Sequence, residues 1–125
     1  MKIDVKTYGL HLTIDGYGAN KKRLDDITFL FETLNKLPEM IGMNKIGFPH
    51  IIQFTEGDIR GISGFIFIIE SHISIHTYSK KRFFSMDVYS CKKFDHKKVV
   101  NIIKKLYKIK EIEVNVIERG KSFPA

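Results

Sequence analysis

Residues 64–77 read Gly-Phe-Ile-Phe-Ile-Ile-Glu-Ser-His-Ile-Ser-Ile-His-Thr, and this stretch contains two adjacent strand patterns. Its first six residues are almost entirely apolar, which is typical of a buried strand. In residues 72–77, isoleucine alternates with serine and histidine, the period of a strand with two unlike faces. No common turn residue separates the two patterns. Glu70 and Ser71 lie at the junction, where polar groups cost stability unless they are hydrogen-bonded, so we interpret both as candidates for chemistry.

The flanking sequence predicts further strands and two helices. Strands are predicted over residues 8–14, 48–54, 62–69, 72–78, 83–91 and 112–116. Apolar residues recur at helical spacing over residues 21–36, with Pro38 expected just past the helix end, and Asp95 is a suitable N-cap for a second helix. The predicted order is β-α-β-β-β-β-α-β. The economical arrangement is an α+β two-layer sandwich, a mostly antiparallel sheet with two helices packed on one face.

The length and composition fit one domain over residues 1–125. With 43% hydrophobic and 12% aromatic residues, the chain can bury a packed core. No apolar run approaches the ~18 residues of a membrane-spanning helix, and residues 1–6 lack the apolar core of a signal peptide. A single cysteine cannot form an intramolecular disulfide, so we expect a cytoplasmic protein with no membrane partner.

The chain is basic, with a net charge of +7. Such a charge can indicate binding to nucleic acid or to an anionic surface. Here the basic residues are dispersed in short groups, as at residues 80–82, 92–93 and 104–105, and no aromatic-basic motif of an RNA-binding sheet is present. We therefore expect a solvated, lysine-rich surface and no nucleic-acid partner.

Taken singly, the polar candidates have ordinary explanations. His72 and His76 share a face of a strand, but no cysteine or carboxylate completes a zinc set, so no metal site is expected. His76 alone fits a hydrogen-bonded core histidine, and Ser63 alone fits a turn serine. Cys91, the single cysteine, is free either to react or to pack as a small hydrophobe. Only the joint spacing of these residues indicates a function.

The octet from Glu70 to Thr77 resembles the self-cleavage site of the prokaryotic S-adenosylmethionine decarboxylase family, whose members make their own cofactor from a serine. The resemblance covers nearly the whole chain in order. The other similar segments are Gly9-Leu10-His11-Leu12, Gly61-Ile62-Ser63-Gly64, Asp87-Val88-Tyr89-Ser90-Cys91 and Glu118-Arg119-Gly120. It implies a pyruvoyl-dependent carboxy-lyase of polyamine biosynthesis, synthesised as a zymogen, with S-adenosylmethionine as the first candidate substrate.

The resemblance also implies how the cofactor arises. Ser71 Oγ attacks the carbonyl of Glu70 and converts the amide to an ester. Elimination then releases residues 1–70 as a β chain, and residues 71–125 form an α chain that begins with a pyruvoyl group. Decarboxylation of an amino acid needs an electron sink, and the pyruvoyl ketone supplies it through a Schiff base with the substrate amine.

Three further residues receive roles from the resemblance. His76 is the expected base for the Ser71 Cα proton, since the pKa of histidine lies near neutral pH. Ser63 is expected to assist cleavage, and Cys91 to return a proton to the substrate Cα. One difficulty follows from strand geometry: Ser71 and His76 have opposite parity and face opposite sides of a straight strand. Either the chain bends near Glu70, which would strain the peptide to be cleaved, or the two residues meet across a sheet edge.

The resemblance fails at one position that matters for the substrate. The family follows its histidine with Thr-aromatic-Pro-Glu, and that glutamate binds the ribose of the substrate, whereas this chain has Thr77-Tyr78-Ser79-Lys80. Lys80 cannot accept hydrogen bonds from a diol. The alternatives are therefore a pyruvoyl-dependent L-ornithine or L-arginine decarboxylase, or an inactive partner subunit, although Ser71 and Cys91 are both retained.

The expected substrate is in each case a small amino-acid-type molecule. Phe48 and Phe54 are candidates to stack an adenine. A dibasic amino acid would instead need a carboxylate, and the candidates are Asp15, Glu56, Asp58 and Asp87. A homodimer of cleaved protomers is expected, because the resemblance implies that two copies supply what one longer chain contains in related enzymes, and C₂ dimers are the commonest oligomers.

Overall fold

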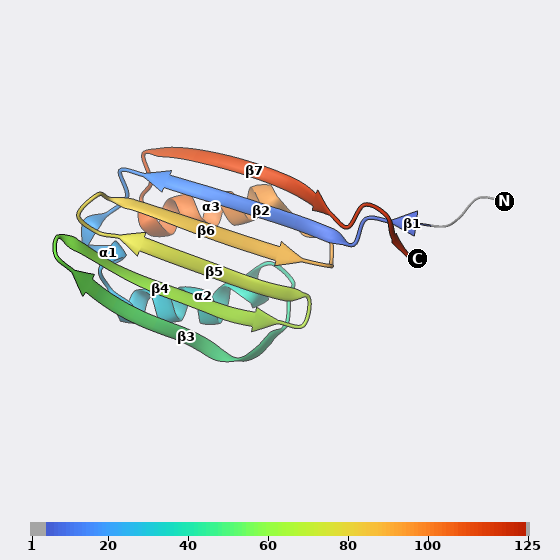
Figure 1. The fold of residues 1–125 in the computed structure, drawn as a ribbon, viewed down its shortest axis with the longest axis horizontal. Coiled ribbons are helices and arrows are strands. Elements are labelled where there is room, and N and C mark those ends of the chain that lie inside the picture. Colours follow the sequence, from blue (N-terminus) through green and yellow to red (C-terminus); the bar gives the residue numbers. More distant parts are fainter. Residues whose placement is uncertain (1–4, 125) are drawn as a thin grey trace.

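A computed structural model describes residues 5–124 and contains one six-stranded sheet with helices on a single face (Figure 1). The elements in chain order are β1 (Val5–Lys6), β2 (Gly9–Tyr17), α1 (Lys21–Leu24), α2 (Ile27–Met40), β3 (Lys45–Glu56), β4 (Ile59–Ile68), β5 (Ser71–Tyr78), β6 (Phe83–Ser90), α3 (His96–Tyr107), β7 (Glu111–Arg119) and β8 (Phe123–Pro124).

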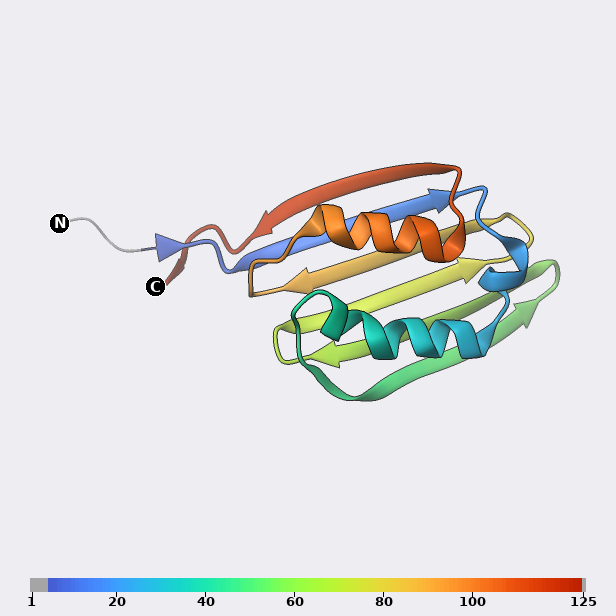
Figure 2. The same ribbon diagram turned by 180° about the vertical axis from the view of Figure 1, so that it is seen from behind.

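The large sheet has the strand order β3-β4-β5-β6-β2-β7, and every neighbouring pair is antiparallel. A separate two-stranded ribbon of β1 and β8 joins the two ends of the chain beside the sheet (Figure 1). The α+β class and the order of the main elements are therefore confirmed. In the view from behind, α2 lies across the β3–β5 half of the sheet and α3 across the β6–β7 half (Figure 2).

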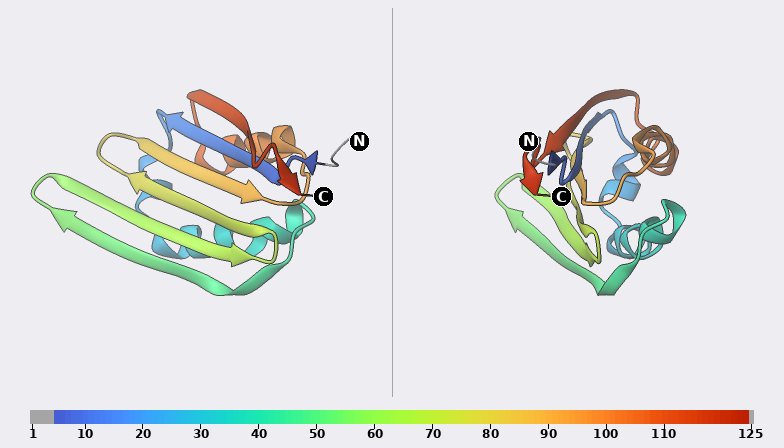
Figure 3. Two further views of the ribbon diagram at one scale, coloured as in Figure 1. Left: turned by 45° about the vertical axis from the view of Figure 1, so that its right-hand side comes forward. Right: turned by 90° about the vertical axis from the view of Figure 1, so that its right-hand side faces the viewer.

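The core forms between this sheet and the two long helices. Along β5 and β6 alternate residues are buried, and the buried set includes Ile73, Ile75, Phe84 and Met86. This is the apolar face that the two-residue period predicted would pack on helices. The opposite side of the sheet, which we call the open face, carries no helix among residues 5–124 (Figure 3).

The first helical segment differs from the prediction. The chain forms a short helix, α1, and then a second one that begins at Ile27, because Asp26 caps α2 by accepting a hydrogen bond from the Phe29 N–H at 3.0 Å. Pro38 lies inside the last turn of α2, not past its end. A proline removes one helical hydrogen bond and distorts the helix locally, and here only two residues of α2 follow it, so little of the helix is affected. The Pro38 carbonyl accepts from the Met43 N–H at 2.8 Å. Three helices result, not two.

The second long helix agrees with the prediction. Asp95 caps α3 by accepting from the Lys98 N–H at 3.1 Å. The helix ends at Lys108, which has a left-handed conformation with φ of 52°. Among the described residues, no helix has both the length and the apolar character needed to cross a lipid bilayer.

The strand before the Glu-Ser junction is buried on one side only. Ile66 and Ile68 lie under the helices, whereas Phe65, Phe67 and Ile69 are 38%, 53% and 68% exposed. The prediction of a buried strand is thus confirmed for the face under the helices and wrong for the opposite face. The reason is that both long helices cover the same face, which leaves the apolar side chains of the open face to solvent.

Candidate active site

The Glu-Ser junction lies at a hairpin turn. Ile68 pairs with Ser71, so Ile69 and Glu70 form a two-residue turn between β4 and β5, although neither is a common turn residue. Ser71 adopts a φ of 156°, which L-residues rarely occupy. The chain therefore turns at Glu70, before Ser71, and this turn does not lie between Ser71 and His76. The unusual backbone conformation falls on the residue that follows the peptide expected to be cleaved.

The carbonyl oxygen of Glu70 is held by the end of β6. It accepts a hydrogen bond from the backbone N–H of Cys91 at 2.9 Å. Buried Ser90 fixes this corner, since its hydroxyl accepts from the Lys92 N–H at 2.9 Å and donates to the Lys92 carbonyl at 2.8 Å. Gly9 lies against the corner, and a Cβ there would come within 2.1 Å of the Ser90 carbonyl oxygen. Cys91 itself is exposed and borders a hollow of ≈ 350 Å³.

The side chain of Glu70 is buried and bound to Asn44. One carboxylate oxygen accepts from the Asn44 backbone N–H at 3.1 Å, and the other from its Nδ2 at 3.2 Å. Burial raises the pKa of Glu70, but the hydrogen bonds from Asn44 and the charge of Lys92 outweigh it, and the pKa is lower than the ordinary value. No pattern in the sequence indicated Asn44, which lies 26 residues from Glu70 along the chain.

Ser63 and His76 form a pair on the open face. They are direct partners in the register of β4 and β5, and His76 Nδ1 lies 2.8 Å from Ser63 Oγ. Both are half-buried and border a hollow of ≈ 310 Å³ that also includes His50 and Ser74. The structure therefore brings together two of the residues that the sequence selected.

The structure does not bring this pair to Ser71. Ser71 is the first residue of β5, and His76 lies five positions along the same strand, roughly 17 Å at ~3.3 Å per residue. His76 is on the open face, whereas Ser71 is in register with Ser90, whose side chain is buried under the helices. One chain by itself thus separates the expected nucleophile from the expected base.

A polar network at the centre of the open face was not expected from the sequence. Asp87 lies 2.8 Å from His11 Nε2 and accepts a hydrogen bond from Ser74 at 3.2 Å. Arg119 lies 3.0 Å from the other ring nitrogen of His11, so this nitrogen accepts and Nε2 donates to Asp87. Asp15, on the same face, has a raised pKa because of burial and the nearby charges of Glu113 and Asp87. The alternation of polar and apolar residues in β2 and β6 is the sequence feature that could have indicated this network.

Lys80 lies at the far end of β5 from Ser71. Its Nζ is 3.5 Å from a carboxylate oxygen of Asp58, and both residues border a hollow of ≈ 500 Å³ with Tyr78 and Phe83. Of the four candidate carboxylates, only Asp58 borders this hollow. Phe54 contacts Tyr78 with ring centroids 6.3 Å apart.

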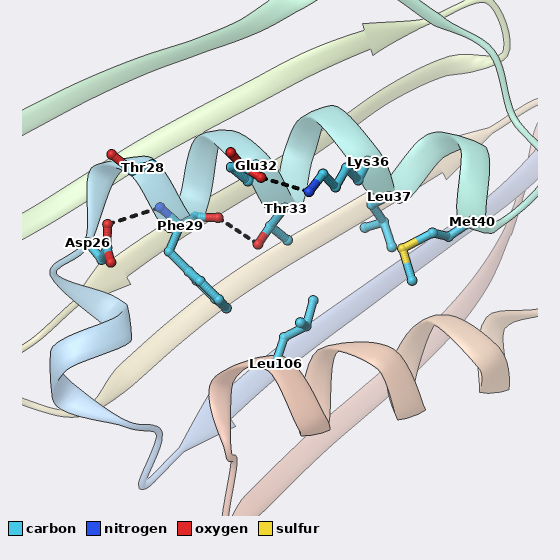
Figure 4. A pocket seen from close by; sticks show the side chains of 9 residues that line it. All are labelled: Asp26, Thr28, Phe29, Glu32, Thr33, Lys36, Leu37, Met40 and Leu106. Atoms are coloured by element: carbon cyan, nitrogen blue, oxygen red, sulfur yellow. Dashed lines mark hydrogen bonds and ion pairs between the residues drawn. The ribbon is translucent and has the colours of Figure 1, made fainter.

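A groove lies between α2 and α3, on the helix side of the molecule, opposite the open face (Figure 4). Its walls include Phe29, Leu37 and Met40 from α2 and Leu106 from α3, and none of the predicted site residues borders it. In residues 5–124 no three His, Cys, Asp or Glu side chains are grouped so that they could hold a metal ion.

The fold and the turn define a class of protein, an α+β sandwich with a Glu-Ser junction at a hairpin of a six-stranded antiparallel sheet. A solved structure of this kind is the adenosylmethionine decarboxylase from Aquifex aeolicus VF5, with a TM-score of 0.79 and 31% identity over 92% of each chain. The family model for S-adenosylmethionine decarboxylase matches residues 10–120. The chain belongs to the S-adenosylmethionine decarboxylase family.

Curated relatives agree with this assignment. The S-adenosylmethionine decarboxylase proenzyme of Clostridium botulinum strain Loch Maree is 35% identical over 118 residues, which are 94% of this chain and 98% of the relative. The proenzyme of Persephonella marina is 36% identical over 119 residues, 92% of this chain and 84% of the relative. The resemblance drawn from Glu70 to Thr77 is confirmed, as is the expected class of enzyme, a decarboxylase.

Proposed function

We propose that this chain cleaves itself between Glu70 and Ser71 and then decarboxylates S-adenosylmethionine with a pyruvoyl group at position 71. The observation that carries this proposal is the geometry of the junction. The Glu70 carbonyl receives the Cys91 N–H at 2.9 Å, and Ser71 has the unusual φ of 156°. An N–H aimed at a carbonyl oxygen stabilises the negative charge that develops when a nucleophile attacks that carbonyl.

The nucleophile and the attacked carbonyl of the proposed cleavage both belong to this chain. Ser71 Oγ attacks the Glu70 carbonyl carbon, the C–N bond breaks, and the hydroxyl proton moves to the Ser71 nitrogen, which leaves an ester. A base then removes the Ser71 Cα proton, and Glu70 leaves as a carboxylate. The resulting dehydroalanine loses ammonia by hydrolysis. A pyruvoyl group at this position supplies the electron sink that an amino-acid decarboxylation needs.

The base in this proposal is His76 of a second copy of the chain. Ser71 and His76 of one chain are roughly 17 Å apart along β5, far beyond the ~3 Å reach of a proton transfer. The proposal requires a two-fold symmetric pair with facing open faces, in which each Ser63–His76 pair lies opposite the partner's turn. The exposed apolar side chains Phe65, Phe67 and Ile52 on the open face support such a contact.

Cys91 is the proposed proton donor after decarboxylation. It follows directly after β6, and its backbone already contacts the Glu70 carbonyl. The thiol is exposed beside a hollow lined by Tyr8, Gly9 and Leu10, which is large enough to admit part of a small substrate. A thiol is a weak acid that can donate a proton to a carbanion and recover one from solvent.

One observation keeps a second substrate class open. Lys80 occupies the position of the ribose-binding glutamate, and the carboxylate nearest to it is that of Asp58. Because this end of β5 is far from Ser71 of the same chain, Asp58 would act on a substrate bound at Ser71 of a second copy. There it could bind the distal cation of ornithine or arginine, or accept the hydrogen bonds of a ribose in place of the missing glutamate. A lost hydrogen bond of ~1–3 kcal/mol would weaken S-adenosylmethionine binding about tenfold or more without abolishing it.

Two measurements test the proposal. Denaturing electrophoresis with intact-mass analysis should give two fragments for the wild type, one full-length chain for Ser71→Ala, and two fragments for the exposed control Ser122→Ala. A wild-type chain that never divides rules out the self-cleaving enzyme. Carbon dioxide release is then compared for S-adenosylmethionine, ornithine and arginine. Release from ornithine or arginine alone selects the second class, and a gain with S-adenosylmethionine in Lys80→Glu identifies position 80 as the cause.

A further inference from the structure

Asn44 makes three hydrogen bonds to the two residues of the turn before Ser71. Its backbone N–H and its side-chain Nδ2 donate to the two carboxylate oxygens of Glu70, at 3.1 and 3.2 Å. Its carbonyl accepts from the Ile69 N–H at 2.9 Å. We call Asn44 and Glu70, with these hydrogen bonds, the turn clamp.

The turn clamp holds the turn from the side opposite Cys91. Asn44 immediately precedes β3, on the outer side of β4, whereas Cys91 follows β6 and donates to the Glu70 carbonyl at 2.9 Å. The side chain of Glu70 is therefore fixed by one neighbour and its carbonyl by another. A two-residue turn without glycine or asparagine has little intrinsic preference for this geometry, so these contacts stabilise it.

Glu70 is a charged residue that is buried at a turn, which is unusual. The residue is 7% exposed, and burial of a charged group is costly unless hydrogen bonds compensate. Asn44 provides a donor to each of its two oxygens, and hydrogen bonds to charged groups are about twice as strong as those between neutral groups. The carboxylate is consequently fixed in one orientation, and the peptide that joins Glu70 to Ser71 is fixed with it.

We propose that Asn44 is a positioning residue for self-cleavage, which orients the Glu70–Ser71 peptide for attack by the Ser71 hydroxyl. It touches neither the hydroxyl nor the attacked carbonyl, and acts through the Glu70 side chain and the Ile69 N–H. This inference rests on the proposed self-cleavage. Positioning a nucleophile and its target correctly contributes a large part of the rate of an intramolecular reaction, and small displacements reduce that rate strongly.

The single-variant test follows cleavage of newly made protein. Full-length chains are labelled during a short pulse of cell-free synthesis, and the fraction divided is measured by electrophoresis against time. Asn44→Asp places a second carboxylate against Glu70 and should slow cleavage about tenfold or more. Glu70→Gln removes the charge but leaves an amide pair that Asn44 can satisfy by turning its side-chain amide over, so it should slow cleavage less. The matched control is Asn101→Asp, at an exposed position on α3, which should cleave at the wild-type rate.

The double variant Asn44→Asp/Glu70→Gln separates positioning from stability. It exchanges donor and acceptor across the turn clamp while the Asn44 backbone N–H still has an oxygen to bind, so cleavage should return to within about threefold of the wild-type rate. Thermal unfolding midpoints are recorded for every variant in a Ser71→Ala background. Restoration of the midpoint without restoration of cleavage overturns the proposal.

The outcomes also distinguish this inference from the proposed function. If the wild type never divides, the self-cleaving enzyme is wrong and the turn clamp has no such role. If the wild type divides and Asn44→Asp divides at the same rate while folded, only the positioning role is overturned. If both single variants fail to fold, the exchanged pair still decides, because its folded chain either cleaves near the wild-type rate or does not.

Discussion

At the scale of single residues, Cys91 contributes two different groups to the site, a backbone N–H and a thiol. Its backbone N–H donates to the Glu70 carbonyl, which bears on cleavage, and its thiol is exposed, which bears on the later proton transfer. A substitution of the side chain leaves the N–H in place. Cleavage and turnover should therefore separate in a Cys91 variant.

We accordingly expect Cys91→Ala to divide into two fragments but to decarboxylate poorly, with kcat reduced about 10²-fold or more, as is typical for loss of a general acid. Electrophoresis measures the first property and carbon dioxide release the second. Cys91→Ser, which keeps a polar hydrogen of much weaker acidity, serves as the comparison. Full turnover by divided Cys91→Ala would remove the thiol from the mechanism.

The pKa of Glu70 predicts a dependence of stability on pH. This pKa is lower in the folded chain than its ordinary value of 4.5, so the charged carboxylate stabilises the fold above that value, and the stabilisation is lost as pH falls through the lowered pKa. In a Ser71→Ala background, Glu70→Gln should lower the free energy of unfolding by about 1–3 kcal/mol at neutral pH.

Urea unfolding at a series of pH values measures this effect. The difference between Glu70 and Glu70→Gln should shrink as pH falls below the ordinary value of 4.5, toward the folded pKa. The exposed control Glu39→Gln, on α2, should show a small difference throughout. A Glu70→Gln difference that stays constant from neutral pH to about pH 3 would contradict the role of the charge.

At the scale of elements, capping residues determine where α2 and α3 begin and where α3 ends. Asp26 and Asp95 each accept a hydrogen bond from the N–H three residues later, and each begins a helix. Lys108 ends α3 in the left-handed conformation, with its N–H bonded to the Lys104 carbonyl. Glycine is the preferred residue at that position because it has no Cβ to clash.

Lys108→Gly should therefore raise the free energy of unfolding by about 0.5–1 kcal/mol, the cost of the left-handed conformation less the greater entropy of unfolded glycine. The matched control is Lys105→Gly, the same change inside α3, which should lower stability by about 1 kcal/mol. Both are measured by urea unfolding in the Ser71→Ala background. A loss of stability in both variants would show that the cap conformation carries no cost.

At the scale of the whole molecule, the open face is the side of the sheet that no helix of the described residues covers. It combines exposed apolar side chains with the Ser63–His76 pair and the Asp87 network, all on a sheet that two helices cover from the other side (Figure 3). Sheets that pack face to face lie about 10 Å apart, so a second copy could approach the turn and the hollows of the first.

A mixture of two inactive variants tests whether the site is shared. Ser71→Ala lacks the nucleophile and His76→Ala lacks the base, so neither should cleave alone. If the base acts in trans, a mixed dimer has one complete site, and the His76→Ala chain should divide when the two are co-expressed. Mass analysis identifies which chain is cut. Mixed dimers that form without any cleavage would show that the two residues act within one chain or not at all.

The local pattern of the sequence determined much of the fold. The alternation in residues 72–77 and 83–91 fixed which side chains face the helices, because the pleat of a strand depends only on neighbouring residues. The Asp95 cap was readable for the same reason. The site residues could be selected by type and spacing through the family resemblance, although their grouping could not.

Only the tertiary structure decided which polar groups meet. Asn44 reaches Glu70 and the Cys91 N–H reaches its carbonyl because of the order of strands in the sheet, which no local pattern encodes. The same order separates Ser71 from His76, although they are close in sequence, because an extended strand carries residues apart by ~3.3 Å at each step. Sequence thus determined most of the elements and the faces of β5 and β6, and the packing of distant segments determined the geometry of the site.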